Sequence, residues 1–69
     1  MKPLDRKLSR IRLGLNQNTV AARVGCSRSV ISMMENDGYS VSPEIERGYD
    51  RLLTRLLNEN EGGNGHDTL

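Results

Sequence analysis

Polar side chains that donate hydrogen bonds are concentrated in "QNTVAARVGCSRSVISMMEN", residues 17–36. Amide, hydroxyl and guanidinium groups recur there, and no Asp or Glu occurs between Asp5 and Glu35. Such donors bind anions such as phosphate, because each N–H or O–H points at an oxygen that carries negative charge. The stretch pairs no nucleophile with a base, so it favours recognition of an anion over catalysis.

The charge of the chain is divided between its two halves. Residues 1–35 contain seven Lys or Arg and two acids, a net charge of +5, whereas residues 36–69 contain three Arg and seven acids, a net charge of −4. The asymmetry points to an anionic partner for the first half. A solvated cationic face without a partner is the alternative on charge alone.

Two short helices are predicted to carry the polar side chains. Asn16 is expected to cap the first, which Gly25 ends, and Ser27 to cap the second. Their apolar faces are Val20, Ala21 and Val24 on the first helix and Val30, Ile31 and Met34 on the second. Once these faces are buried, the side chains left exposed on the second helix are Arg28, Ser29, Ser32 and Met33. Two such helices joined by a tight turn form a helical hairpin or a helix-turn-helix, and the exposed set favours the latter.

Further helices are predicted on both sides. Apolar residues spaced by four, three and four predict a helix from Pro3 to Leu13, with Gly14 just past its end: Leu4, Leu8, Ile11 and Leu15. Asn36-Asp37-Gly38 predicts a turn. Ser42 and Pro43 begin a helix that is expected to end near residues 58–60, with the apolar stripe Ile45, Tyr49, Leu52, Leu53, Leu56 and Leu57.

The expected fold class is therefore all-α, a small bundle of four to five helices containing a helix-turn-helix. Residues 1–60 would form this domain, with a C-terminal amphipathic helix that also mediates dimerisation. Residues 61–69, "EGGNGHDTL", are expected to be a disordered tail.

The starts of the two short helices break a local rule. Acidic residues are favoured in the first turn of a helix because its N-terminus carries partial positive charge. The sequence places Asn16-Gln17-Asn18 and Ser27-Arg28-Ser29 at these positions instead, whereas Glu44 lies in the first turn of the last helix. An anion such as a phosphate would fit where the acid is missing.

The stretch "RIRLGLNQNTVAARVGCSRSVISMMEN", residues 10–36, resembles the helix-turn-helix of lambdoid phage repressors, Cro proteins and their Xre-like relatives. The positions that carry the resemblance are Gln17, Ala21, Gly25, Ile31 and Glu35. The resemblance implies a cytoplasmic, sequence-specific regulator of a bacterial or phage-infected cell. It would bind an operator in double-stranded DNA, act as a repressor, and insert its third helix, residues 27–35, into the major groove.

The resemblance also implies roles for individual residues. Base contacts are expected from Arg28, Ser29, Ser32 and Met33. Contacts to phosphate, or support of the contacting residues, are expected from Gln17, Asn16, Asn18, Ser27, Asn36 and Arg10. Arg10 and Glu35 match a pair that forms a buried salt bridge in some family members. After Asn36 the sequence departs from the family, because relatives commonly have a basic loop and two short helices there.

The last helix has more large apolar residues than one small core needs. An exposed apolar patch marks an interface, and two-fold dimers are the commonest assembly. A homodimer is therefore expected, with Tyr49, Leu53, Leu56 and Leu57 at its interface. The alternative function is an antitoxin-like or anti-factor protein-interaction module that uses the acidic second half to hold a basic partner.

Several classes of protein are not favoured. Cys26 is the only cysteine and His66 the only histidine, so neither a disulfide nor a zinc site is expected within the chain. No apolar run approaches the ~20 residues of a membrane span, and no secretory signal is visible. The sequence predicts no enzyme, no cofactor and no small-molecule ligand.

Overall fold

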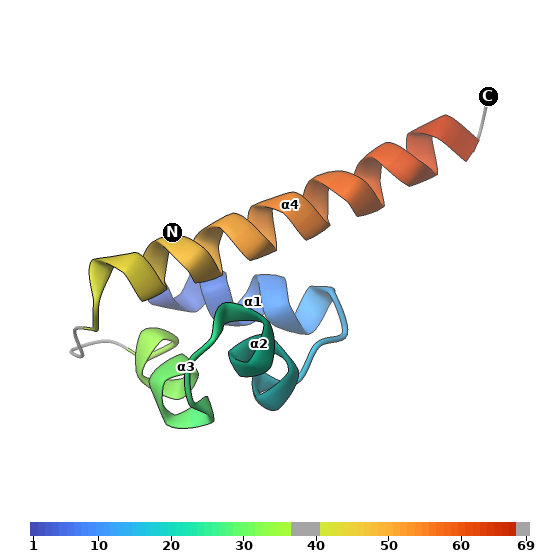
Figure 1. The fold of residues 1–69 in the computed structure, drawn as a ribbon. Coiled ribbons are helices and arrows are strands. Elements are labelled where there is room, and N and C mark those ends of the chain that lie inside the picture. Colours follow the sequence, from blue (N-terminus) through green and yellow to red (C-terminus); the bar gives the residue numbers. More distant parts are fainter. Residues whose placement is uncertain (37–40, 68–69) are drawn as a thin grey trace.

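The computed structural model describes residues 1–36 and 41–67, and their side chains up to residue 59. Four α-helices occupy these residues: α1 (Pro3–Arg12), α2 (Gln17–Val24), α3 (Arg28–Met34) and α4 (Pro43–Asp67). No strand occurs in the described ranges, so the predicted all-α class is confirmed. In Figure 1, α4 lies along one side of the domain, and α2 and α3 lie on the opposite side.

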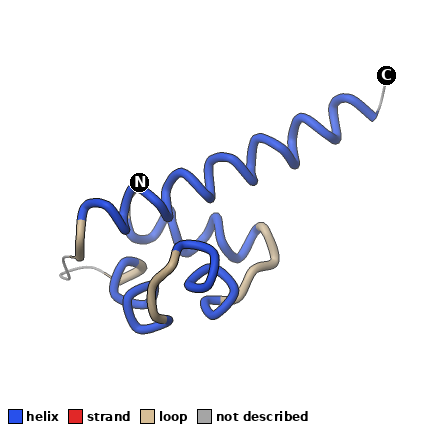
Figure 2. Tube along the Cα trace, in the orientation of Figure 1, coloured by secondary structure: helices blue, strands red, loops and turns tan. Residues whose placement is uncertain are grey.

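The predicted boundaries of the first three helices agree closely with the structure. Pro3 begins α1, and Gly14 follows its end with φ of 74°. The backbone of Gly25 is left-handed, with φ of 90°, directly after α2. Both glycines occupy a conformation that L side chains rarely adopt, and this is why each helix ends where it does. Figure 2 shows the short connections that separate α1, α2 and α3.

The last helix is longer than expected. The sequence predicted its end near residues 58–60 and a disordered tail from residue 61, but α4 continues to Asp67. Each residue added to an existing helix gains a backbone hydrogen bond, so a helix propagates beyond its packed segment more easily than it starts. Gly48 does not interrupt it. Asp37 and Gly38, in the predicted turn, lie outside the described residues.

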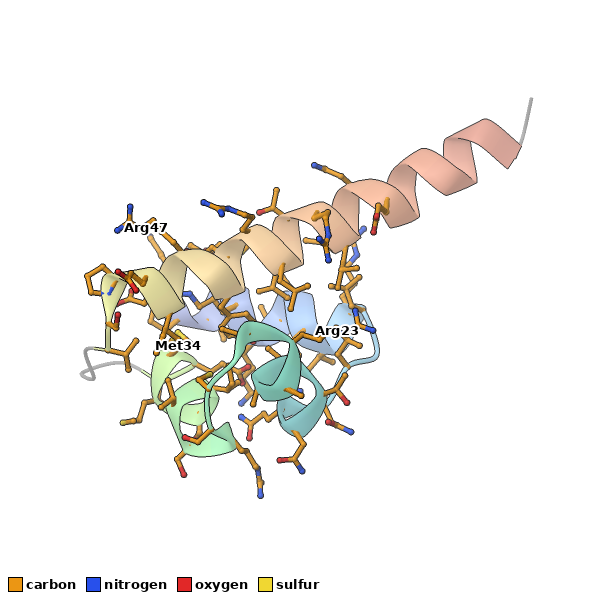
Figure 3. All side chains as sticks on the ribbon, viewed as in Figure 1. Arg23, Met34 and Arg47 are labelled. Carbon is orange, nitrogen blue, oxygen red and sulfur yellow. The ribbon has the colours of Figure 1, made fainter. Side chains whose placement is uncertain are left out.

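The core lies where α2, α3 and α4 meet. Its buried members are Val20, Ala21, Ile31, Met34, Tyr49, Leu52 and Leu53. Met34 points from α3 toward α4 in Figure 3. The predicted apolar faces of α2 and α3 are thus the buried ones, with Val24, Cys26 and Val30 partly buried around them.

Two of the four residues expected at a dimer interface belong to this core. Tyr49 and Leu53 each have 0% of their surface exposed within the single chain. They are therefore unavailable to a second chain, because removing them would open the centre of the domain. Leu56 packs against the core while partly buried, and Leu57 is also partly buried. The apolar stripe of α4 is longer than one small core was expected to need. In the structure, much of it is used because α4 covers the apolar faces of both α2 and α3.

The apolar stripe of α1, in contrast, is exposed to solvent. Leu4, Leu8 and Ile11 are 60%, 54% and 53% exposed. The side of α1 that faces the domain carries Arg6 and Arg10, which lie about half a turn around the helix from the stripe. Acids of α4 and the residue after α3 bind these arginines, so the charged side of α1 turns inward and the apolar side faces solvent.

Candidate nucleic-acid interface

The caps of α2 and α3 form as predicted. Asn16 Oδ1 accepts a hydrogen bond from the Thr19 amide at 2.8 Å, and Ser27 Oγ accepts one from the Val30 amide at 3.3 Å. Neither first turn contains an acid. Each helix therefore presents the positive end of its dipole without an acidic side chain to offset it.

The structure brings most of the predicted contact residues together. A shallow hollow of about 260 Å³ is lined by Gln17, Arg28, Ser29 and Ser32. A second hollow of about 520 Å³ is lined by Arg10, Asn16, Gln17, Asn18 and Arg28. Gln17 and Arg28 border both hollows, so the starts of α2 and α3 form one continuous polar surface.

Arg28 and Gln17 are joined across this surface. Arg28 Nε donates to Gln17 Oε1 at 3.3 Å, although the two residues lie on different helices. Gln17 Nε2 in turn donates to Glu35 Oε1 at 3.2 Å. An exposed arginine is thus linked through one amide to a buried carboxylate. This link restrains the guanidinium, which would otherwise lose more rotamer freedom when it contacts a ligand.

Glu35 is the anchor of the link. Arg10 donates to it twice, from Nε to Oε2 at 2.7 Å and from Nη2 to Oε1 at 3.0 Å, and Tyr49 Oη donates to Oε2. The side chain of Glu35 is only 2% exposed. Burial by itself would raise the pKa of Glu35, but the hydrogen bonds from Arg10, Tyr49 and Gln17 outweigh it and lower the pKa below 4.5. The predicted Arg10–Glu35 salt bridge is therefore present and buried.

Arg10 supports the surface from beneath. Its Nη1 donates to the Leu15 carbonyl at 2.9 Å, in addition to its two bonds to Glu35. The side chain is 12% exposed. Of the two roles predicted for Arg10, the geometry favours support over direct phosphate contact.

A second internal ion pair was missed by the sequence analysis. Arg6 Nε donates to Asp50 Oδ1 at 2.7 Å, Arg6 Nη2 bonds Asp50 and Glu46 at 3.2 Å each, and Arg6 Nη1 donates to the Met34 carbonyl at 3.3 Å. One signal for it was present in the sequence. Arg6 and Arg10 are four residues apart, as are Glu46 and Asp50, so each pair lies on one face of its helix. Arg6 and Arg10 together account for two of the seven cations in residues 1–35, so the exposed positive charge is smaller than the sequence suggested.

Two predicted contact residues lie apart from the hollows. Met33 is half-buried and lines neither of them. Asn36 is exposed, and its Nδ2 donates to the Ser32 carbonyl at 2.6 Å, where it satisfies the C-terminal end of α3. Cys26 is partly buried, and desolvation raises the pKa of its thiol. A raised pKa suits a packing residue better than a reactive one.

The fold and this surface define a helix-turn-helix domain of the DNA-binding type. The family model described as helix-turn-helix matches residues 7–47, which is more than half of the chain. The chain belongs to this Xre-like helix-turn-helix family, and it is a DNA-binding transcription regulator of the Xre type. No curated protein and no solved structure matches the chain significantly.

In residues 1–36 and 41–67, no helix combines the length and apolarity needed to cross a membrane. Among the side chains that the structure describes, no group of three or more His, Cys, Asp or Glu is arranged to hold a metal ion.

Proposed function

We propose that the protein is a repressor that binds a nearly palindromic operator as a homodimer, with α3 in the major groove. The observation that carries this proposal is the polar surface shared by the starts of α2 and α3. Its exposed residues donate hydrogen bonds, it contains no acid, and Gln17 holds Arg28 in place. These properties suit the edges of bases and the phosphates beside them.

Each helix has its own task in this arrangement. Arg28 would direct its guanidinium fork to O6 and N7 of a guanine, and Ser29 and Ser32 would bond neighbouring base edges. Asn16, Gln17 and Asn18 would meet the phosphate backbone at the start of α2. Ser27, Asn36 and Met33 would act at the border of the contact. Two half-sites, with centres ~34 Å apart or a multiple of this, would present the same face of the duplex to both chains.

The alternative of an acidic protein-interaction module loses support from the ion pairs. Asp50 and Glu46 bind Arg6 within the domain, and Glu35 binds Arg10. Two of the seven acids in residues 36–69, Glu46 and Asp50, are therefore satisfied by the chain itself.

The test is selection of duplexes from a random DNA pool by the full-length protein. The expected result is one enriched motif with two-fold symmetry. The affinity for that motif should fall steeply with salt, because each neutralised phosphate releases counterions. Absence of enrichment, or a salt-independent affinity, would contradict the proposal.

A further inference from the structure

Three of the four large apolar side chains that are exposed in the described residues lie on one stripe of α1. Leu4, Leu8 and Ile11 are each more than half exposed, whereas the fourth, Met1, precedes the helix and is 46% exposed. In a helix, positions spaced by four and three residues form one seam, the pattern of the a and d positions of a coiled coil. A continuous apolar seam on a small soluble domain marks an interaction surface.

The inner side of α1 is already occupied. Arg6 reaches Asp50 on α4 and the Met34 carbonyl of α3. This side of α1 therefore faces the junction of α3 and α4, and the seam faces away from both. Within the described residues, Leu4, Leu8 and Ile11 remain more than half exposed, so the seam is open to another molecule.

We propose that the seam of α1 binds the α1 of a second copy of this chain in antiparallel orientation. This inference rests on the proposed function, for which it supplies the dimer surface. In the antiparallel pair, Leu8 of each chain packs on Ile11 of the other, and Leu4 lies near the C-terminal end of the other α1, which ends at Arg12. The central layers of the contact are then filled by Leu and Ile.

The charges beside the seam select the second copy and its direction. Asp5 and Arg12 are exposed, lie seven residues apart on one flank, and fall at equivalent positions of the helical repeat, whereas Lys7 lies on the other flank. Antiparallel pairing brings each Asp5 beside Arg12 of the second copy, which makes two attractive contacts. Parallel pairing would bring Lys7 beside Arg12 twice, which is repulsive.

The symmetry of this pair suits an operator. The two-fold axis is perpendicular to α1 and to the line that joins the two α1 helices. In Figure 1, α1 lies between α4 on one side of the domain and α2 and α3 on the other. Because the contacts of Arg6 place the seam on the outer side of α1, the axis runs along the direction from α4 to α3. Rotation about this axis leaves both α3 helices on the same side of the dimer, where one face of a duplex meets them.

The contact is small. Ten helical residues span about 15 Å, and two such helices bury less than the ~1,200 Å² at the lower limit of standard stable interfaces. The free protein should therefore exchange between monomer and dimer, and adjacent half-sites should favour the dimer by raising the local concentration of the chains.

Sedimentation equilibrium over a concentration series tests the surface in the absence of DNA. The wild type should dimerise reversibly, and Leu8→Glu should weaken the dimer at least ~10-fold while circular dichroism shows unchanged helicity, since Leu8 is exposed. Asp5→Arg should weaken the dimer several-fold by replacing two attractive contacts with repulsive ones, and Asp5→Arg with Arg12→Asp should restore it. Dimerisation of Leu8→Glu with wild-type affinity, or a wild type that stays monomeric, would overturn the proposal.

Binding to DNA separates this inference from the proposed function. Fluorescence anisotropy would compare two duplexes made from the selected sequence, one with a single half-site and one with both. Leu8→Glu should bind the single half-site with the affinity of the wild type. Unlike the wild type, it should not bind the duplex with two half-sites more tightly. If Leu8→Glu keeps the higher affinity for two half-sites, the α1 surface is not the dimer interface. If the wild type binds neither duplex, the proposed function is wrong, and the α1 interface is then tested by sedimentation alone.

Discussion

Arg10 and Glu35 form a buried, doubly hydrogen-bonded ion pair that joins the last turn of α1 to the end of α3, with Nε and Oε2 2.7 Å apart. Glu35 also accepts from Tyr49 on α4 and from Gln17 on α2. One carboxylate thus contacts a residue of every other helix, and it supports the polar surface at the starts of α2 and α3.

Replacement of Arg10 should unfold the domain. Arg10→Met leaves Glu35 buried without its cation, which typically costs about 3–5 kcal/mol. That loss is comparable to the total stability expected of so small a core. Thermal denaturation followed by circular dichroism measures it, with Arg23→Met as the control, because Arg23 is exposed on α2 and its removal should change stability by less than ~1 kcal/mol. Equal melting of the two variants would contradict a structural role for Arg10.

Replacement of Arg28 should affect sequence-specific binding more than non-specific binding. Arg28→Ala would remove the proposed bidentate contact to guanine, which is worth about 1–3 kcal/mol of discrimination. Arg28→Lys keeps the charge but lacks the planar fork, so it should recover non-specific affinity without specificity. Anisotropy titrations with the selected duplex and a scrambled one measure both. If Arg28→Ala loses the same factor on each duplex, Arg28 contacts only phosphate.

Stability should fall in acid. Burial raises the pKa of Glu35 and of Asp50, but their hydrogen bonds to arginines and other donors reverse the shift, and both pKa values lie below the ordinary 4.5 and 3.8. A lowered pKa in the folded state stabilises the protein fully above the ordinary value, and this contribution is lost as pH falls through the folded value. The urea midpoint should therefore be nearly constant from pH 7 to about pH 5 and decline below about 4.5.

Asp50→Asn isolates one part of this acid dependence. The variant should be less stable than the wild type at pH 7, and the two urea midpoints should converge at low pH, where Asp50 is protonated. Glu44→Gln, at an exposed carboxylate in the first turn of α4, is the matched control. Parallel curves for Asp50→Asn and the wild type would show that the Arg6 pair contributes nothing to the pH dependence.

Gly48→Ala should stabilise the protein. A Cβ added at Gly48 would meet only Val24 Cγ1, at 3.6 Å, which is ordinary van der Waals contact. Alanine in the middle of a helix is favoured over glycine by roughly 0.5–1 kcal/mol. A rise in the urea midpoint checks this, and a fall would mean that the helix moves closer to Val24 than the structure shows.

Leu53→Ala should be far more damaging than Leu8→Ala. Leu53 is fully buried, so its truncation leaves a cavity and costs about 2–5 kcal/mol, whereas Leu8 is more than half exposed. Chemical denaturation of both variants at a low protein concentration, where the monomer predominates, measures the difference. Similar losses would place Leu8 in the core and remove the basis for the α1 interface.

Local signals in the sequence determined the boundaries of the first three helices and the start of the last. Asn16, Ser27 and Pro43 begin helices, and Gly14 and Gly25 follow helix ends, because caps and left-handed turns depend on residues that are adjacent in the chain. The residues of the polar surface could also be predicted from neighbouring positions in the chain. Burying the apolar faces of two short adjacent helices leaves few choices for the exposed side.

The tertiary structure alone decided which apolar stripe is buried. The stripes of α1 and α4 look alike in sequence, since periodicity identifies an apolar face without naming what covers it. Arg6 and Arg10 face the domain and the leucines of α1 face solvent, because a buried carboxylate without a cation costs more free energy than an exposed leucine. Those ion pairs join residues 25 and 44 positions apart, and no local rule reaches that distance. Tyr49 and Leu53, two of the four residues predicted at an interface on α4, therefore belong to the core, and the exposed apolar surface on which a second chain could dock lies on α1.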